Sequence, residues 1–104
     1  MGEKQEARPA KMPPHPGEYL REDVLPALGM TITDLAGHLG VTRTSLSDFV
    51  HEKRDLSLEM AQRLGQAFGN GARFWLALQM QRDIWVAERD GKIRVERLSW
   101  DDAA

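Results

Sequence analysis

The chain has 104 residues, no cysteine and a formal net charge of −2, from 14 basic and 16 acidic residues. This length fits one domain with a modest core, and the absence of cysteine excludes disulfides and thiolate metal sites. The near-neutral charge argues against a non-specific coat on nucleic acid, but not against a sequence-specific binder with a local positive face. No apolar run is long enough to span a membrane, and the N-terminus lacks the apolar core of a signal peptide, so we expect a cytosolic protein.

The N-terminal region predicts an arm followed by a first helix. Residues 1–14 are polar and rich in proline, so we expect a flexible arm. Pro16 suits the first turn of a helix. That helix should end near Val24 or Leu25, because Pro26 cannot continue it without the loss of a hydrogen bond.

The middle of the chain has the pattern typical of a helix-turn-helix. We expect Thr33 to cap a helix over about residues 34–39, and Gly40 to form the sharp turn, where a positive φ is easiest without a Cβ. Thr42 then caps a second helix, over about residues 43–51. The positions expected to face inward are apolar: Leu35, Leu39, Val41, Leu46 and Phe49.

The outward face of this second helix is polar and suits contact with double-stranded DNA. Its side chains have the length and the hydrogen-bonding groups to reach base edges in a major groove. Arg43 can pair bidentately with guanine, whereas Asp48 can accept from a cytosine amine or orient Arg43. In the charged loop that follows, basic side chains can hold a phosphate. The predicted DNA-binding set is Thr42, Arg43, Thr44, Ser47, Asp48, His51, Lys53 and Arg54.

Other interpretations of the same residues are weaker. A plain helical corner with a solvated polar face is the main alternative. Ser47, Asp48 and His51 include the side-chain types of a hydrolase triad, but nothing is placed to orient the base and no oxyanion site is evident. His15, His38 and His51 lack the spacing of zinc ligands. We therefore expect no catalytic residue, no metal and no cofactor.

Two more helices and a tail are expected in the C-terminal half. The fourth helix begins at Ser57 and ends at Gly69–Gly71, where left-handed backbone is tolerated. The fifth covers about residues 72–88. Beyond the turn signal at Asp90–Gly91, alternating apolar and charged residues suggest a short strand or an extended tail. A hairpin formed across this turn is the alternative, but we favour helix before it.

Large aromatic residues are frequent in the C-terminal third. Core packing accounts for some of them, and an interface is the other interpretation, because aromatics are favoured where two surfaces bury each other. A helix-turn-helix protein usually reads two half-sites about one DNA turn apart, which requires a dimer surface. We expect Phe74, Trp75 and Trp85 to contribute to it.

Several short motifs, taken in order, resemble one known family. They are His15–Glu22, Leu28–Thr31, Leu35–Arg43, Met60–Leu64 and Phe74–Gln79. Together they closely resemble HigA-type antitoxins of the Xre/Cro-like helix-turn-helix group, over about residues 15–88. The opening His-Pro-Gly-Glu and the Phe-Trp-Leu-x-Leu-Gln block are more specific than the helix-turn-helix itself.

The resemblance implies an all-α fold and two partners. The fold is a five-helix Cro/lambda-repressor-like domain over residues 15–90, which dimerises through its C-terminal part. The short extended tail expected over 91–104 lies outside the resemblance. The partners are a palindromic operator, through which the protein represses its own operon, and a small basic HigB/RelE-like ribonuclease toxin, which it neutralises by direct binding. On the matched positions, Thr42, Arg43, Thr44 and Ser47 read DNA, and Lys53 and Arg54 contact the backbone.

Two positions depart from the family pattern. An Asn-Gly pair often follows the recognition helix, whereas this chain has His51-Glu52, which bears on the shape of the loop and its phosphate contact. Ser-Pro-Glu often precedes Phe-Trp, whereas this chain has Gly71-Ala72-Arg73, which predicts a weaker cap for the fifth helix. The alternatives are a stand-alone Cro-like regulator without a toxin and a protein-interaction module whose helix-turn-helix no longer binds DNA.

Overall fold

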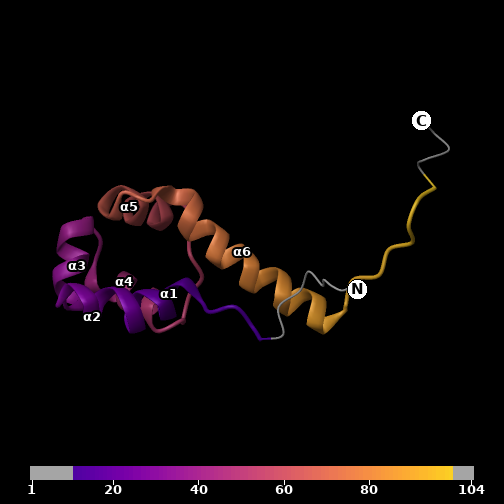
Figure 1. The fold of residues 1–104 in the computed structure, drawn as a ribbon, viewed down its shortest axis with the longest axis horizontal. Coiled ribbons are helices and arrows are strands. Elements are labelled where there is room, and N and C mark those ends of the chain that lie inside the picture. Colours follow the sequence, from indigo (N-terminus) through magenta and orange to yellow (C-terminus); the bar gives the residue numbers. More distant parts are fainter. Residues whose placement is uncertain (1–10, 100–104) are drawn as a thin grey trace, which may run out of the picture.

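The computed structural model describes residues 11–99, and within them all regular structure is helical (Figure 1). The helices are α1 (Pro16–Tyr19), η2 (Leu20–Val24), α2 (Leu25–Leu28), α3 (Ile32–Leu39), α4 (Arg43–Val50), α5 (Leu58–Phe68) and α6 (Gly71–Asp90). Because the first three are continuous, the chain has five helical segments in this range, which confirms the predicted all-α, five-helix fold. The expectations for residues 1–10 and 100–104 lie outside the described residues.

The first helical segment continues past Pro26, so the prediction that it ends near Val24 or Leu25 is wrong. The turn η2 is π-helical, and the N–H of Leu25 donates to the carbonyl of Leu20, five residues back. Pro26 therefore falls in the first turn of α2. A missing N–H costs little there, which explains how the chain remains helical.

Hydroxyl side chains cap the next three helices. The Oγ1 of Thr31 accepts from the N–H of Asp34 at 3.0 Å, and the Asp34 carboxylate accepts from the N–H of Thr31 at 3.2 Å. This reciprocal capping box begins α3 at Ile32, so the prediction that Thr33 caps the helix is wrong. Thr42 and Ser57 cap α4 and α5, as predicted.

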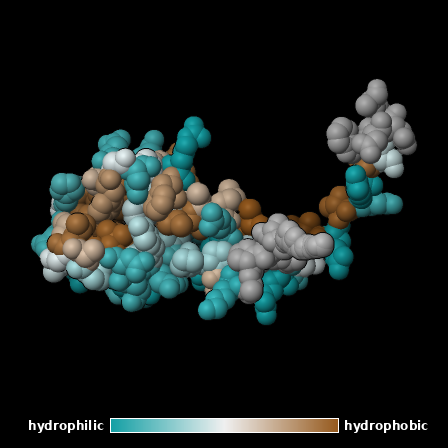
Figure 2. Space-filling model, in the orientation of Figure 1, coloured by the Kyte–Doolittle hydropathy of each residue, from teal (hydrophilic) through white to brown (hydrophobic). Residues whose placement is uncertain are grey.

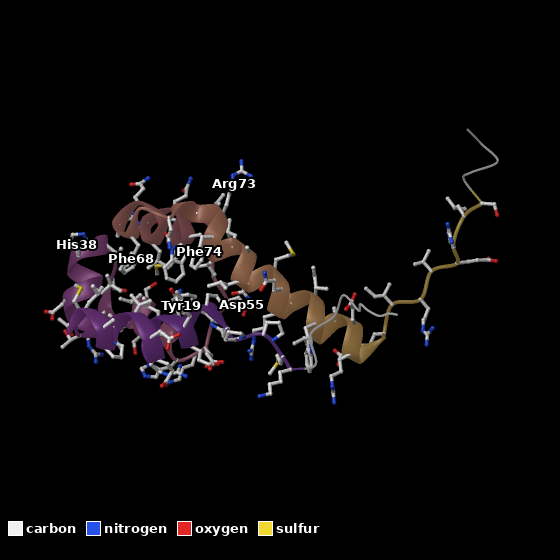
Figure 3. The ribbon with its side chains drawn as sticks, viewed as in Figure 1. Tyr19, His38, Asp55, Phe68, Arg73 and Phe74 are labelled. Atoms are coloured by element: carbon white, nitrogen blue, oxygen red, sulfur yellow. The ribbon has the colours of Figure 1, made fainter. Side chains whose placement is uncertain are left out.

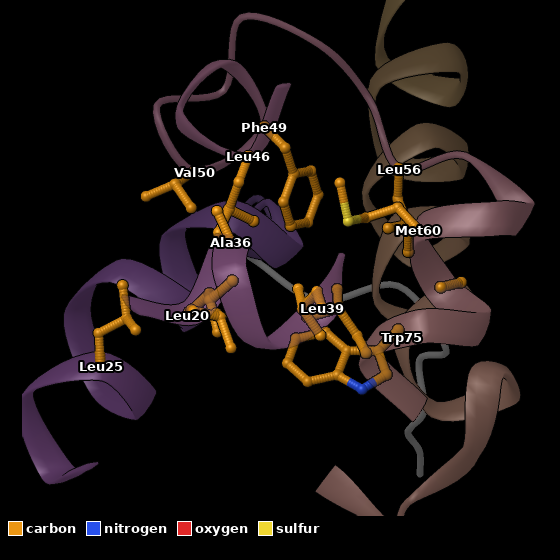
Figure 4. Packing of buried hydrophobic residues seen from close by; sticks show 13 residues of the cluster. Leu20, Leu25, Ala36, Leu39, Leu46, Phe49, Val50, Leu56, Met60 and Trp75 are labelled. Atoms are coloured by element: carbon orange, nitrogen blue, oxygen red, sulfur yellow. The ribbon is translucent and has the colours of Figure 1, made fainter. Parts of the chain in front are cut away.

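The core lies where α1–α4 meet α5 and the first half of α6 (Figure 4). Trp75 of α6 and Phe49 of α4, each 1% exposed, are its largest members. Of the positions expected to face inward, Val41 is partly buried and packs against the core, and the others are fully buried. Burial of each large apolar side chain contributes about 1.5–3 kcal/mol to folding, so these contacts fix α4 against the rest of the domain.

The helix α6 extends well beyond this core, and a tail follows it (Figure 1). Because α6 is helical through Asp90, the hairpin alternative is wrong. Residues 92–99 form neither helix nor strand, and Ile93, Val95 and Leu98 are all more than three-quarters exposed, at 84%, 86% and 78%. No helix among residues 11–99 is long and apolar enough to cross a membrane.

Candidate nucleic-acid interface

The turn between α3 and α4 is fixed by backbone and side-chain hydrogen bonds. Gly40 has a φ of 75°, and its N–H and that of Val41 donate to the carbonyl of Ala36 at 3.0 and 3.1 Å. From α5, Nη1 of Arg63 donates to the carbonyl of Leu39 at 2.7 Å. A cation at the C-terminal end of α3 satisfies a carbonyl that the helix leaves unpaired, so the angle between α3 and α4 is held from two sides.

The predicted DNA-contacting side chains of α4 share its outward face. Leu46, Phe49 and Val50 bury one side of the helix in the core. At helical spacing the opposite side is left to short polar residues. The exposed positions are Thr42, Arg43, Thr44 and His51, and the partly buried ones are Ser47 and Asp48.

An arginine lies on each flank of this face, and the two are held differently. Nε of Arg43 donates to Oγ1 of Thr33 on α3 at 3.0 Å. Nη1 of Arg54 donates to Oγ of Ser45, and Nη2 of Arg54 pairs with Oδ2 of Asp48, both at 3.4 Å. Asp48 therefore holds Arg54, and the suggestion that it orients Arg43 is wrong.

Ser47 and His51 meet on α4 without forming a catalytic site. Nδ1 of His51 lies 3.3 Å from Oγ of Ser47 and 2.9 Å from the carbonyl oxygen of Ser47. The shorter contact needs a proton on Nδ1 of His51, because a carbonyl oxygen can only accept. Asp48 is paired with Arg54 and not with His51, so it does not orient a base. The pair thus offers hydrogen bonds to a ligand, not nucleophilic chemistry.

The loop after α4 turns at Glu52, which adopts a left-handed conformation with φ of 63°. The N–H of Lys53 donates to the backbone carbonyl of Asp48 at 2.7 Å, and the N–H of Glu52 donates to that of Phe49 at 3.0 Å. This is a Schellman C-cap, a motif in which glycine usually takes the left-handed position. The chain therefore makes the turn without the Asn-Gly pair that often stands at this place in the family.

Two arginines hold Glu52 in that conformation. Its carboxylate accepts from Nη1 of Arg21 at 3.3 Å and lies 3.7 Å from Nη2 of Arg82. Arg21 also donates to the carbonyl of Val50 at 2.7 Å. Hydrogen bonding to Glu22, and less strongly to Glu52, raises the pKa of Arg21 above its ordinary value. Lys53 and Arg54 therefore lie in a loop whose first turn is fixed.

The His-Pro-Gly-Glu motif and the Phe-Trp-Leu-x-Leu-Gln motif both support this loop, a role that sequence reasoning missed. Nδ1 of His15 accepts from the N–H of Gly17 at 2.9 Å and caps α1. A Cβ on Gly17 would collide with the carbonyl of Phe49 near the end of α4. At the far end of the loop, Oε1 of Gln79 accepts from the N–H of Leu56 at 2.8 Å. The loop is thereby anchored at both ends.

The three aromatic residues predicted for the dimer surface occupy different environments. Trp75 is 1% exposed, and its Nε1 donates to Asn70 at 2.9 Å, so it is a core residue and its assignment to a dimer surface is corrected. Phe74 is 39% exposed beside Tyr19, at a ring distance of 6.0 Å (Figure 3). Trp85 is partly buried, with the Arg89 guanidinium 5.0 Å from its ring centre.

Comparison with known proteins places this arrangement in a family. A helix-turn-helix family model matches residues 20–75. Virulence-associated protein A' of Dichelobacter nodosus is 47% identical over 75 residues, which cover 71% of this chain and 64% of that protein. The chain thus spans slightly less than two thirds of that relative.

Solved structures give the same assignment. The antitoxin GraA has a TM-score of 0.77 and 34% identity, over 86% of this chain and 100% of that chain. The Pseudomonas aeruginosa antitoxin HigA, solved with the higBA promoter, has a TM-score of 0.73 and 33% identity, over 83% of this chain and 98% of that chain. The HigA structure thus contains promoter DNA, and GraA has also been solved in complex with its operator. The chain belongs to the helix-turn-helix family and, within it, to the HigA-type antitoxins.

Proposed function

We propose that this protein binds a two-fold symmetric operator as a homodimer, with α4 in the major groove, and represses its own operon. The observation that carries this proposal is the outward face of α4: hydrogen-bonding side chains lie along its centre and an arginine stands on each flank. A groove-reading helix needs such side chains, because they pair with base edges, while nearby cations and backbone N–H groups hold phosphates. The structure of the related HigA with the higBA promoter supports the same use of the fold.

A dimer surface on α6 completes the proposal. Apolar side chains are exposed along α6, from the core outward: Phe74, Met80, Ile84 and Val86, at 39%, 59%, 48% and 40%. At helical spacing these residues fall on several sides of the helix, and a helix that is apolar on several sides is usually buried. Figure 2 shows apolar surface along this part of the chain. We place the two-fold axis at α6, with Phe74 and Trp85 contributing, and each α4 then reads one half-site.

The experiment is a binding titration with the duplex upstream of the protein's own reading frame. Arg43→Ala should weaken specific binding by roughly 1–3 kcal/mol and leave the fold intact, because the side chain is exposed. Arg73→Ala is the matched control, since it removes the same charge from an exposed position on α6, outside the helix-turn-helix (Figure 3). Equal affinities for Arg43→Ala and the wild type would remove Arg43 from the interface.

The antitoxin activity itself is proposed from the family. We propose that the protein neutralises a small basic RelE-like ribonuclease by direct binding, without chemistry of its own. The test is co-expression with the short reading frame beside its gene. Growth arrest by that neighbour alone, rescue by this protein and a stable co-purified complex are expected. A harmless or non-binding neighbour would favour the alternative of a stand-alone regulator, and other relatives are described as HTH-type transcriptional regulators.

A further inference from the structure

The hydrogen bond between Arg43 and Thr33 joins the two helices of the helix-turn-helix through their side chains. Nε of Arg43, at the first position of α4, donates to Oγ1 of Thr33, at the second position of α3, at 3.0 Å. Both side chains are exposed. No other side-chain partner of Arg43 is found within residues 11–99. An exposed arginine has about 2 kcal/mol of rotamer entropy, and an anchor at Nε removes part of that freedom before a ligand binds.

The atom that Thr33 engages determines which part of the guanidinium remains available. A guanidinium carries five N–H donors in a rigid fork. It can meet a partner side-on, through Nε and one Nη, or end-on, through both Nη atoms. Because Nε is already bonded to Thr33, the side-on geometry is blocked and the end of the fork is free. Two parallel N–H groups at that end match the O6 and N7 acceptors of a guanine.

Arg54 provides the contrast within the same surface. Its two terminal nitrogens are engaged by Ser45 and Asp48, at 3.4 Å each. The end of the Arg54 fork is therefore occupied in the free protein, whereas that of Arg43 is presented. Arg43 is therefore prepared for base recognition. Arg54 is suited to a phosphate contact, which needs only charge and proximity.

We propose that Thr33 is a positioning residue that sets base specificity: it holds Arg43 so that the end of its guanidinium reads one guanine in each half-site. This inference rests on the proposed function. Thr33 acts through Arg43 and reads no base itself. Its own hydroxyl proton stays available, because a threonine hydroxyl that accepts from Arg43 can still donate to a phosphate.

The experiment is selection of duplexes from a random-sequence pool, carried out in parallel with the wild type, Thr33→Val, Thr33→Ser and Arg43→Ala. Valine keeps the branched shape without the acceptor, and serine keeps the acceptor. The wild type and Thr33→Ser should enrich the same symmetric motif. Thr33→Val should lose the preference for guanine at the same position as Arg43→Ala, and should bind the wild-type motif roughly three- to tenfold more weakly.

The possible outcomes distinguish the positioning role of Thr33 from the operator binding on which it rests. In the Arg43→Ala background, Thr33→Val should cause no further loss, because the partner is already absent. A merely structural role for Thr33 would instead lower the unfolding midpoint without changing base preference. If Thr33→Val enriches the wild-type motif with wild-type affinity, the positioning role is overturned while DNA binding stands. If the wild type enriches no motif, both fail.

Discussion

Gly17 lies directly against the carbonyl oxygen of Phe49, so α1 and the end of α4 approach each other too closely for a Cβ. The His15 cap and Pro16 in the first turn place the backbone of Gly17 at this point. The contact ties the first helical segment to the recognition helix. The His-Pro-Gly motif is therefore explained by packing beneath α4 and not by contact with a ligand.

Gly17→Ala should destabilise the protein by about 1–3 kcal/mol, because the added methyl group meets backbone that cannot turn aside. Gly37→Ala is the control: it lies within α3 with nothing within 4 Å of an added Cβ, and should stabilise by about 0.4–1 kcal/mol. Urea unfolding of both variants measures the difference. Equal stabilities would show that the α1–α4 contact gives way easily.

Replacement of Glu52 separates backbone strain from its ion pairs. Glu52→Gly and Glu52→Ala both remove the carboxylate that contacts Arg21 and Arg82. Only alanine keeps a Cβ at φ of 63°, so Glu52→Gly should be more stable than Glu52→Ala by about 1 kcal/mol. Thermal unfolding of the glycine and alanine variants measures this difference in stability. An alanine variant as stable as the glycine variant would contradict the left-handed conformation.

Gln79→Ala should lower the free energy of unfolding, measured in urea, by about 1–3 kcal/mol, because it leaves the buried N–H of Leu56 without its acceptor. Gln81→Ala, at an exposed position on the same helix, is the control and should stay near the wild type. Because Leu56 ends the loop that carries Lys53 and Arg54, operator affinity should also fall for Gln79→Ala. A loss of stability no greater than that of Gln81→Ala would show that water takes over the hydrogen bond from the N–H of Leu56.

Much of the fold could be predicted from the sequence, because the relevant signals are local. Gly40, Thr42 and Ser57 mark helix ends by their own backbone or hydroxyl chemistry, and the structure agrees. The prediction failed at Pro26, because a π-helical turn upstream is not visible as a pattern of residue types. It failed at Thr33 because two hydroxyl residues competed for one cap, and the carboxylate of Asp34 selected Thr31.

The placement of the candidate side chains on the outward face of α4 could be predicted from the sequence, but their pairing could not. Polar side chains on the outward face of α4 follow from helical spacing. That Asp48 holds Arg54, and that Thr33 holds Arg43, depends on the angle between helices and on the loop after α4. Glu52 could not have been identified, because a glutamate rarely adopts a left-handed backbone and its two arginine partners are distant in sequence.

The salt dependence of operator binding measures the phosphate contacts. Each of Lys53 and Arg54 should contribute about one unit to the slope of log affinity against log salt, so the double alanine variant should lose about two units. The exposed tail residues Lys92 and Arg94, replaced together by alanine, are the charge-matched control. An unchanged slope for the Lys53/Arg54 variant would mean that this loop is merely solvated.

If the protein dimerises through α6, the double variant Met80→Asp/Ile84→Asp should shift it toward monomer in sedimentation. Both side chains are about half exposed in the single chain, so the fold should persist. Leu28→Asp, at an apolar position of α2 that is 52% exposed, is the control and should leave the dimer intact. A monomeric wild type would overturn the proposed dimer.

The most direct test of the central claim locates α4 on the DNA. The chain has no cysteine, so Thr44→Cys supplies a single attachment point for a DNA-cleaving iron chelate, at an exposed position in the first turn of α4. The account predicts strand cleavage within both half-sites of the bound duplex, about one helical turn apart. Gln66→Cys, exposed on α5, should give none. Cleavage from position 66 but not from position 44 would contradict a recognition role for α4.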